Sequence, residues 1–354
     1  MNYTLVTGGL GFIGSHTVVQ LIEHNYNVII VDNLSNSNIN VLKNIKKICN
    51  CNDTKLIFFQ FDTTKLDNLE LIFSTYNIYN IIHFASFKSV SQSISSPLIY
   101  YHNNIVSTLN LLELCSKYKV KHFIFSSSAT VYGSQSSPLY ENTTIGTNIT
   151  NPYGQTKYMI EQILKDMHQS NIYTNIIILR YFNPVGAHYS GLIGETPNGI
   201  PNNLMPYILN VAIKNNIKTD LNEIYSKLKI YGNNYNTKDG TCIRDFIHIE
   251  DLASAHLKSI EYLDNNPDIT FDIFNIGTGK GTTVLEMVNT FIKVNNVIIP
   301  YEINENRPGD IGIVYCDTTK SNNILKWKAT KNLEDICRDS YKYILCNLDV
   351  LKLI

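Results

Sequence analysis

The stretch that decides the fold is TGGLGFIGSH, residues 7–16. Its glycines, Gly8, Gly11 and Gly14, follow the apolar and β-branched segment YTLVT at 3–7 and precede a helical pattern at 12–24. Glycines in this context let the backbone turn tightly and approach a pyrophosphate, whose charge meets the N-terminus of the helix. The stretch therefore predicts a dinucleotide-binding strand, turn and helix at the start of the chain.

Alternating strand and helix patterns extend outward from this stretch. Further strands are expected at 27–32, 55–62, 80–85, 122–128, 175–182 and 271–277, and helices at 97–119, 153–170 and 249–263. Short apolar strands separated by helices are typical of a parallel sheet with crossovers. We expect an α/β fold, a doubly wound parallel Rossmann sheet with a second, smaller substrate-binding α/β lobe. The Rossmann domain would comprise 1–183 and about 246–280, and the lobe 184–245 and 281–354.

Composition excludes several classes of protein. The chain has 354 residues, of which 44% are hydrophobic and 17% charged, and a formal net charge of -1. No overall basic field exists to attract nucleic acid or an anionic membrane, and no apolar run approaches the ~20 residues of a membrane-spanning helix. The seven cysteines are scattered. We expect reduced thiols in a cytoplasmic protein and no metal site.

Polar residues follow the predicted strands at their carboxyl ends, where doubly wound sheets bind ligands. Asp32 ends the second strand at the position where an acid accepts hydrogen bonds from an adenosine ribose and repels a 2′-phosphate, so NAD is favoured over NADP. Asp62 suits the adenine amino group, and Ser127 is expected only to cap its strand. The remaining strand ends are Thr63, Phe84 with Ala85, Ser126 with Ser128, and Tyr181 with Phe182 and Asn183.

Four further motifs narrow the interpretation: SSSATVYG (126–133), NPYGQTK (151–157), RYFNPVGAH (180–188) and GIPNNLMPY (199–207). With the glycine stretch, they resemble the UDP-glucose 4-epimerase (UDP-galactose 4-epimerase) family of the extended short-chain dehydrogenase/reductase superfamily. The resemblance runs in order from residue 2 to about residue 340. It implies tightly bound NAD and a lobe that binds a nucleotide sugar. It also implies a homodimer built from the helices near 97–119 and 153–170 as a four-helix bundle.

The resemblance assigns catalysis to Tyr153, Lys157 and Ser128, and the chemistry agrees. Tyr153 and Lys157 are four residues apart, so both side chains would lie on one face of a helix. A tyrosine has an ordinary pKa of ~10, so Tyr153 needs help to act as a base, and the charge of Lys157 would lower its pKa. Ser128 would orient the proton.

Other contacts are implied by the matching motifs. Cofactor contacts are expected from the glycine loop and from residues after each strand: Phe12, Ile13, Asn33, Asn36, Lys88, Asn103, Ser126 and Phe182. Arg244 and Arg307 would clamp the substrate pyrophosphate, because guanidinium binds phosphate oxygens bidentately. The other substrate contacts are Lys88, Asn183, Asn203, Tyr231, Asp310 and Val314.

Val314 falls where the family places a side chain beside the 2-substituent of the sugar. A small residue there admits an N-acetyl group, so UDP-GlcNAc and UDP-GalNAc are expected as additional substrates. Two alternatives remain open. A sugar-nucleotide 4,6-dehydratase would need an acid pair directly after Ser128, where Ala129 and Thr130 stand. A non-catalytic NAD-binding regulator would be expected to lack part of the Ser128, Tyr153 and Lys157 set.

Overall fold

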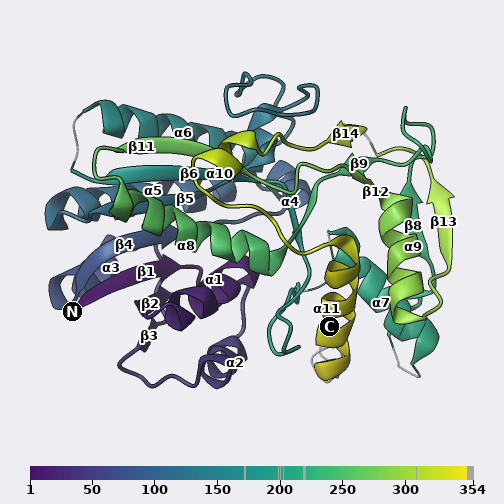
Figure 1. The fold of residues 1–354 in the computed structure, drawn as a ribbon, viewed down its shortest axis with the longest axis horizontal. Helices are drawn as coiled ribbons and strands as arrows, with labels where there is room; N and C mark the ends of the chain where they lie inside the picture. The colour runs from purple at the N-terminus through teal and green to yellow at the C-terminus, as the bar shows by residue number, and fades with distance from the viewer. Residues whose placement is uncertain are drawn as a thin grey trace.

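A central parallel sheet forms the larger part of the computed structural model, which describes residues 1–170, 173–197, 199, 201, 203–217, 221–307 and 309–348. Seven strands lie in the order β11-β6-β5-β4-β1-β2-β3 (Figure 1), and the strand pairs are parallel. Their bounds are β1 Asn2–Thr7, β2 Asn27–Val31, β3 Leu56–Phe59, β4 Asn77–His83, β5 His122–Ser128, β6 Asn175–Tyr181 and β11 Phe271–Ile276. The expected doubly wound fold is confirmed.

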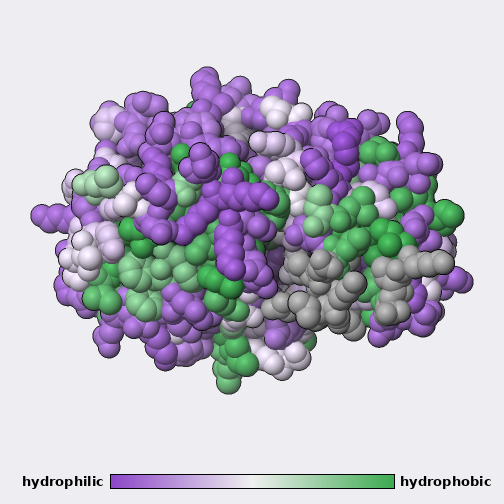
Figure 2. All heavy atoms as spheres, turned by 90° about the horizontal axis from the view of Figure 1, so that it is seen from below, coloured by the Kyte–Doolittle hydropathy of each residue, from purple (hydrophilic) through white to green (hydrophobic). Residues whose placement is uncertain are grey.

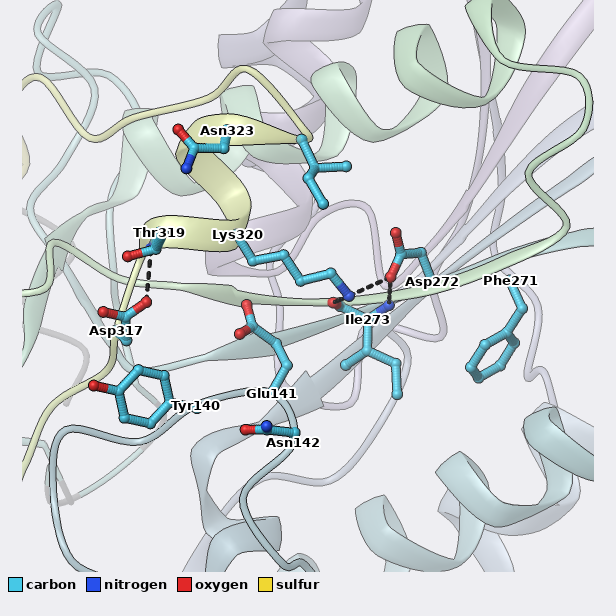
Figure 3. A pocket seen from close by; sticks show the side chains of 11 residues that line it. Tyr140, Glu141, Asn142, Phe271, Asp272, Ile273, Asp317, Thr319, Lys320 and Asn323 are labelled. Atoms are coloured by element: carbon cyan, nitrogen blue, oxygen red, sulfur yellow. Dashed lines mark hydrogen bonds and ion pairs between the residues drawn. The ribbon is translucent and has the colours of Figure 1, made fainter.

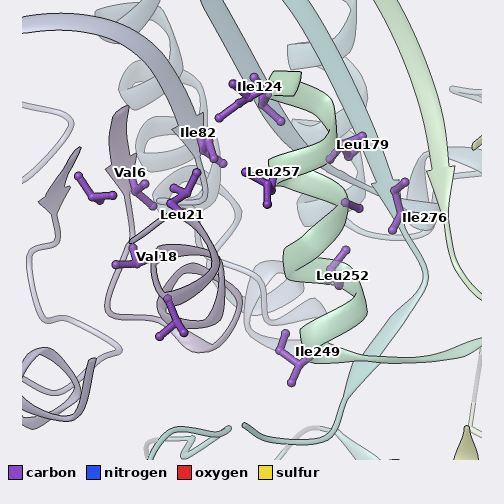
Figure 4. Close-up of a cluster of buried hydrophobic side chains, with 14 of the residues drawn as sticks. Val6, Val18, Leu21, Ile82, Ile124, Leu179, Ile249, Leu252, Leu257 and Ile276 are labelled. Carbon is purple, nitrogen blue, oxygen red and sulfur yellow. The ribbon is translucent and has the colours of Figure 1, made fainter. Parts of the chain in front are cut away.

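Helices cover both faces of this sheet. The apolar core on one face joins it to α1 (Phe12–Glu23), α2 (Asn40–Cys49) and α8 (Ile249–Asn265). Figure 4 shows α8 above the sheet with Leu252 and Leu257 among the residues of this core. The core on the other face joins the sheet to α3 (Leu66–Thr75), α5 (Pro97–Tyr118) and α6 (Pro152–Gln169). Strands buried on both faces explain why their sequences read as continuous apolar runs.

A separate apolar core holds the smaller lobe, on the right of Figure 1. Its helices are α7 (Leu204–Asn216), α9 (Val284–Asn295) and α11 (Leu333–Cys346), and the strand pair β8 (Leu228–Tyr231) with β13 (Tyr301–Asn304) packs with them. Short strands link the lobe to the sheet: β7 (Asn183–Val185) with β10 (Phe246–His248), and β9 (Ile243–Arg244) between β12 (Thr282–Thr283) and β14 (Ile313–Val314). The remaining elements are α4 (Val90–Ser95), α10 (Thr319–Asn323) and 3₁₀ turns at Ala129–Tyr132 and Glu223–Tyr225.

Part of the 281–354 segment packs in the core of the central sheet. Leu325 and Trp327, inside the 281–354 segment, are buried in the core beside α8 rather than in the lobe. The Trp327 indole donates to the Ser254 hydroxyl at 2.8 Å. The division into 1–183 with 246–280 and 184–245 with 281–354 stays a prediction.

Several elements differ from expectation in extent. The third strand is shorter than 55–62, and α2, α3 and α4 have no counterpart among the expected helices. Within the described residues, none of the helices combines the length and apolar character needed to cross a bilayer. Figure 2 shows one face of the molecule, on which hydrophilic side chains predominate and apolar residues gather in separate areas.

Candidate active site

The carboxyl ends of the central strands meet at one edge of the sheet, and the strand order reverses between β1 and β4. Such a reversal leaves a crevice in which doubly wound sheets bind nucleotides. Gly8 follows β1, and a Cβ atom placed on it would lie 2.9 Å from the Ala85 nitrogen after β4. The loops carrying the glycine stretch and the predicted cofactor residues Phe84 and Ala85 are therefore in direct contact at the crevice.

The glycine loop lies close to neighbouring backbone at this point, and it is followed by the uncapped N-terminus of α1. A Cβ atom on Gly14 would lie only 2.2 Å from the Gly8 oxygen, and Gly8 has a φ of 68°, a conformation that favours glycine. Gly11 precedes α1 and provides no side-chain cap, so the first N–H groups of the helix, at Phe12 and Ile13, have no capping side chain. Close backbone approach with free N–H donors fits a pyrophosphate.

Asp32 is held beside this loop by the chain itself. One carboxylate oxygen accepts the Leu10 N–H at 3.0 Å, and the other accepts the Leu34 N–H at 3.0 Å and the Ser37 hydroxyl at 2.7 Å. An ionised carboxylate offers about four acceptor positions, so capacity remains for a ribose hydroxyl. This remaining acceptor capacity of Asp32 fits the ribose hydroxyls of NAD.

The other residues that we expect near the adenosine of the cofactor follow the neighbouring strands β2 and β3. Asp62 accepts hydrogen bonds from the Thr64 N–H at 2.8 Å, the Thr64 hydroxyl at 2.7 Å and the Asn33 side chain. Thr63 is buried, and its carbonyl accepts the Asn110 amide at 3.0 Å. Asn36 is exposed beyond β2. The structure thus joins Asn33 and Asp62, which lie twenty-nine positions apart in the sequence.

The predicted catalytic pair lies at the start of α6. The Asn151 side chain caps this helix by accepting the Gly154 N–H at 2.8 Å, and Pro152 occupies the first turn. Tyr153 and Lys157 therefore follow one turn apart on a helix whose start is fixed. The Lys157 ammonium nitrogen donates to the Ser126 carbonyl at 2.7 Å and lies 5.9 Å from the centre of the Tyr153 ring.

Ser128 completes the group. Its hydroxyl is hydrogen-bonded to the Tyr153 phenol and also accepts the Thr130 N–H at 3.2 Å. Ser128, Tyr153 and Lys157 come from a strand end and a helix start, and the fold brings them together at the edge of the sheet that carries the glycine loop. A phenol, a hydroxyl and an ammonium so arranged can move a proton to and from a bound alcohol.

Burial has the largest effect on the pKa values of both Tyr153 and Lys157. It lowers the pKa of Lys157 to about 7, and the negative charge of Glu161 partly opposes this. Burial also raises the pKa of Tyr153, which the hydrogen bond from Ser128 partly opposes. The expected lowering of the Tyr153 pKa by Lys157 is therefore absent in the chain by itself, because desolvation of the phenol outweighs it.

Two residues to which the sequence analysis gave no role support this edge. The Tyr181 hydroxyl is hydrogen-bonded to the Ser126 side chain and to Nε2 of His256. The His256 ring packs on Phe84, with 4.8 Å between ring centres. Burial raises the pKa of Tyr181 and lowers that of His256 to about 3, so both are neutral at pH 7. Tyr181 lies within the quoted motif RYFNPVGAH, which was the available signal.

Glu195 was also missed, and it joins two predicted contacts. Its carboxylate accepts Lys88 at 3.1 Å and the Asn203 amide at 2.9 Å. Lys88, a predicted contact for both cofactor and substrate, also lies 6.0 Å from the centre of the Phe12 ring in the glycine loop. Asn103 lies on α5 and donates to the Asn104 side chain at 3.0 Å. Nothing in the Gly- and Pro-rich sequence around Glu195 distinguished it from a surface acid.

Arg244 and Val314 lie side by side on two short paired strands. They are partners in the parallel pairing of β9 with β14. One Arg244 nitrogen donates to the Ile243 and Ile311 carbonyls, at 2.9 and 2.8 Å, which fixes the side chain while leaving other guanidinium donors for a ligand. Val314 packs in the small core that contains Phe182.

Asn183 follows Phe182, and its N–H donates to the Asp245 carbonyl at 2.9 Å, beside Arg244. The second predicted clamp is more open. The Arg307 guanidinium donates to Asp310 at 2.9 Å and lies 5.0 Å from the centre of the Tyr231 ring. The structure thus brings three predicted substrate residues together: Tyr231, Arg307 and Asp310.

A cavity of about 680 Å³ lies elsewhere, at the sheet edge formed by β11, and Figure 3 shows it. Tyr140, Phe271 and Ile324 give it apolar walls, and Lys320 crosses it to the Ile273 carbonyl at 2.9 Å. None of the catalytic residues lines it, so it is not a candidate for their chemistry. A second cavity, also about 680 Å³, is lined by 233–234 and 303–306 in the lobe.

One group of potential metal ligands occurs in the described part of the chain. Atoms of His248, Glu250 and Asp339 lie within 4.8 Å of one another. The Lys331 ammonium is 2.8 Å from Glu250 and 3.6 Å from Asp339. Lysine therefore supplies the positive charge that these carboxylates need.

Comparison with known proteins connects this geometry with a family. Residues 4–277 match the model of the NAD dependent epimerase/dehydratase family. The chain is similar to a UDP-glucose 4-epimerase of Bacillus subtilis (strain 168), with 45% identity over 349 residues that cover 98% of each chain.

Solved structures agree over the full length. A UDP-glucose 4-epimerase from Bifidobacterium longum in complex with NAD+ and UDP is 41% identical, with a TM-score of 0.90 over 99% of this chain and 100% of the other. A UDP-glucose-4-epimerase from Stenotrophomonas maltophila, with bound NAD and formylated UDP-arabinopyranose, is 38% identical, with a TM-score of 0.91 over 98% and 99%.

Proposed function

We propose that this chain, which belongs to the NAD dependent epimerase/dehydratase family, interconverts UDP-glucose and UDP-galactose. It is an NAD-dependent isomerase with full-length similarity to UDP-glucose 4-epimerases. The observation that carries the proposal is the meeting of Ser128, Tyr153 and Lys157 beside the glycine loop.

The chemistry explains why these groups are needed. Inverting C4 directly would require removal of an unactivated C–H proton, for which no side chain is basic enough. NAD, when bound, supplies a reversible hydride acceptor, so the sugar can pass through a 4-ketone and be reduced on its other face. Tyr153 takes the proton of the 4-hydroxyl and later returns it, while Ser128 orients that proton. Lys157 holds a positive charge that favours the phenolate.

The substrate lies between the sheet edge and the lobe. Arg244 and Arg307 bind the pyrophosphate, Tyr231 packs on the uracil, and Asp310 accepts hydrogen bonds from the uridine ribose. Asn183, Asn203 and Lys88 contact phosphate or sugar. The pairing of Arg244 with Val314 and the grouping of Arg307 with Tyr231 support this assignment.

Both alternatives lose support. A 4,6-dehydratase would need acids directly after Ser128, whereas Ala129 and Thr130 stand there and form a 3₁₀ turn. A non-catalytic regulator would have no need for an intact set of catalytic residues. Full-length similarity to 4-epimerases favours the isomerase over both.

The test is turnover of UDP-galactose to UDP-glucose by the purified protein without added NAD, with nicotinamide quantified in an acid extract. We expect turnover, stoichiometric nicotinamide and loss of turnover in Tyr153→Phe. An inactive wild-type protein without extractable nicotinamide would contradict the proposal.

The finer substrate range follows from Val314. Valine is small at this position, where its half-buried side chain packs beside Phe182, so the pocket next to C2 of the sugar would admit an N-acetyl group. UDP-GlcNAc and UDP-GalNAc are therefore included among the substrates.

The protein acts as a homodimer in the cytoplasm. Apolar side chains are exposed on α4 and α5, where Leu98 is 80% and Ile94 60% exposed, and burial of such residues in a helical interface would stabilise a dimer. All seven cysteines lie among the described residues and are unpaired, as suits a reducing compartment.

A further inference from the structure

A buried ion pair lies directly behind the catalytic group. Tyr153, Lys157 and Glu161 follow one another at intervals of four along α6, so they share one face of the helix. Glu161 and Arg180 are each 2% exposed, and Arg180 donates to both carboxylate oxygens of Glu161, at 2.7 Å from Nη2 and 3.0 Å from Nε. A bidentate pair at this depth fixes both side chains in one geometry.

The pair also holds the strand end that carries Ser128. The Ser127 hydroxyl, which was expected to cap its strand, instead donates to the Glu161 carboxylate. Ser127 stands between Ser126, whose carbonyl accepts Lys157, and Ser128, whose hydroxyl bonds Tyr153. Through the Ser127 side chain, Glu161 is therefore hydrogen-bonded to the strand end whose neighbouring residues contact both Lys157 and Tyr153.

Arg180 extends this anchorage to the loop after Ser128. Its Nη1 donates at 3.0 Å to the Tyr132 hydroxyl and at 3.0 Å to the Glu141 carbonyl. The Tyr132 hydroxyl in turn donates to the Asn275 side chain at 2.6 Å. Strands β5, β6 and β11 and helix α6 are thus connected through one carboxylate.

Glu161 differs in charge from the neutral titratable groups around Lys157. On β4, His83 is neutral because burial lowers its pKa to about 3, and on β6, Tyr181 is neutral because burial raises its pKa. Tyr100 of α5 faces Tyr153 and is also neutral, since burial raises its pKa. Glu161 is the carboxylate that acts on Lys157 and raises its pKa, which burial lowers to about 7.

We propose that Glu161 is a positioning residue of the epimerase reaction: with Arg180, it holds the Ser126–Ser128 strand end against α6, and it places a negative charge one helical turn from the Lys157 ammonium. This inference rests on the proposed function. It assigns a role to a buried pair that lies outside the predicted substrate and cofactor contacts.

The experiment compares the pH profiles of kcat for UDP-galactose in the wild type, Glu161→Gln and Glu161→Asp. Glutamine keeps the shape of the side chain and removes its charge. The alkaline limb, which reports deprotonation of Lys157, should therefore move to lower pH by about one unit, with kcat reduced by about tenfold and KM unchanged. Aspartate keeps the charge, so both limbs should stay in place. Asp251→Asn, a buried carboxylate on α8 that accepts the Thr330 and Lys331 N–H groups, is the control for a merely structural loss and should move neither limb.

A Glu161→Gln profile that superimposes on that of the wild type would overturn the inference. If this variant does not fold, Ser127→Ala decides, because it removes only the anchoring hydrogen bond and leaves the ion pair intact. We expect about a tenfold lower kcat with an unchanged KM for Ser127→Ala, and a wild-type kcat would overturn the inference. An inactive wild-type protein would refute the proposed function itself, so the two failures are distinguishable.

Discussion

Replacing Lys157 with methionine should stabilise the fold while abolishing turnover. The Lys157 side chain is 3% exposed, and burial lowers its pKa from the ordinary 10.5 to about 7. Methionine fills the space of the apolar stem without the ammonium. A residue that destabilises the protein for the sake of its reaction is expected where function requires a buried charge.

The magnitude follows from the two pKa values. Because the folded-state pKa lies below the unfolded one, the unfolded chain binds more protons between pH 7 and pH 10.5, so stability rises with pH across that window. The destabilisation by Lys157 is fully present below pH 7, at about 5 kcal/mol for the full shift, and it disappears as the pH approaches 10.5. Methionine leaves the Ser126 carbonyl without its donor, which costs about 1–3 kcal/mol. The variant should therefore be more stable by about 2–4 kcal/mol at pH 6–7.

The assay is urea unfolding of the wild type and Lys157→Met at intervals from pH 6 to pH 10.5, with nicotinamide content measured in both preparations. The stability difference should shrink steadily above pH 7 and reverse between about pH 8 and pH 10. Lys165→Met, at an exposed position on the same helix, should show no such pH dependence. A stability difference that is constant over this range would refute the burial argument, and normal turnover by Lys157→Met would refute its role in the reaction.

Three further predictions concern the cofactor, the substrate and the assembly. Gly14→Ala would place a Cβ atom 2.2 Å from the Gly8 oxygen, so the variant should be purified without nicotinamide while its circular dichroism spectrum stays that of a folded protein; full nicotinamide content would contradict the loop assignment. Val314→Tyr should remove turnover of UDP-GalNAc and spare that of UDP-galactose, and equal loss of both would contradict the pocket argument. Leu98→Asp should halve the mass measured by light scattering, whereas a monomeric wild type would contradict the dimer.

The sequence was sufficient to predict features that depend on a local pattern of residues with matching chemistry. The glycine loop, Asp32 and the pairing of Tyr153 with Lys157 were predicted because each depends on spacing within one strand, turn or helix. The helices α2 and α3 were not predicted, although both lie between correctly placed strands. Their short amphipathic patterns are weak by themselves and become helical through packing against the sheet.

Residues whose roles depend on a distant partner could not be inferred in this way. Glu195 reads as a surface acid until the fold places it between Lys88 and Asn203. Ser127 reads as a strand cap until Glu161 is seen to accept a hydrogen bond from its hydroxyl. Hydrogen bonds between segments far apart in the chain leave no periodic signal in the sequence.

The sequence by itself determined the parallel sheet and predicted the dinucleotide site, because strand and helix periods and glycine geometry are local properties of the backbone. The prediction of Tyr153 as the base came from the family resemblance and from its spacing to Lys157. Only the tertiary structure decided how those groups titrate. Lys157 and Tyr153 both have pKa values shifted by burial in the direction that disfavours their charged forms. Desolvation depends on everything packed around a side chain, including the Glu161–Arg180 pair behind them, and that environment exists only once the chain has folded.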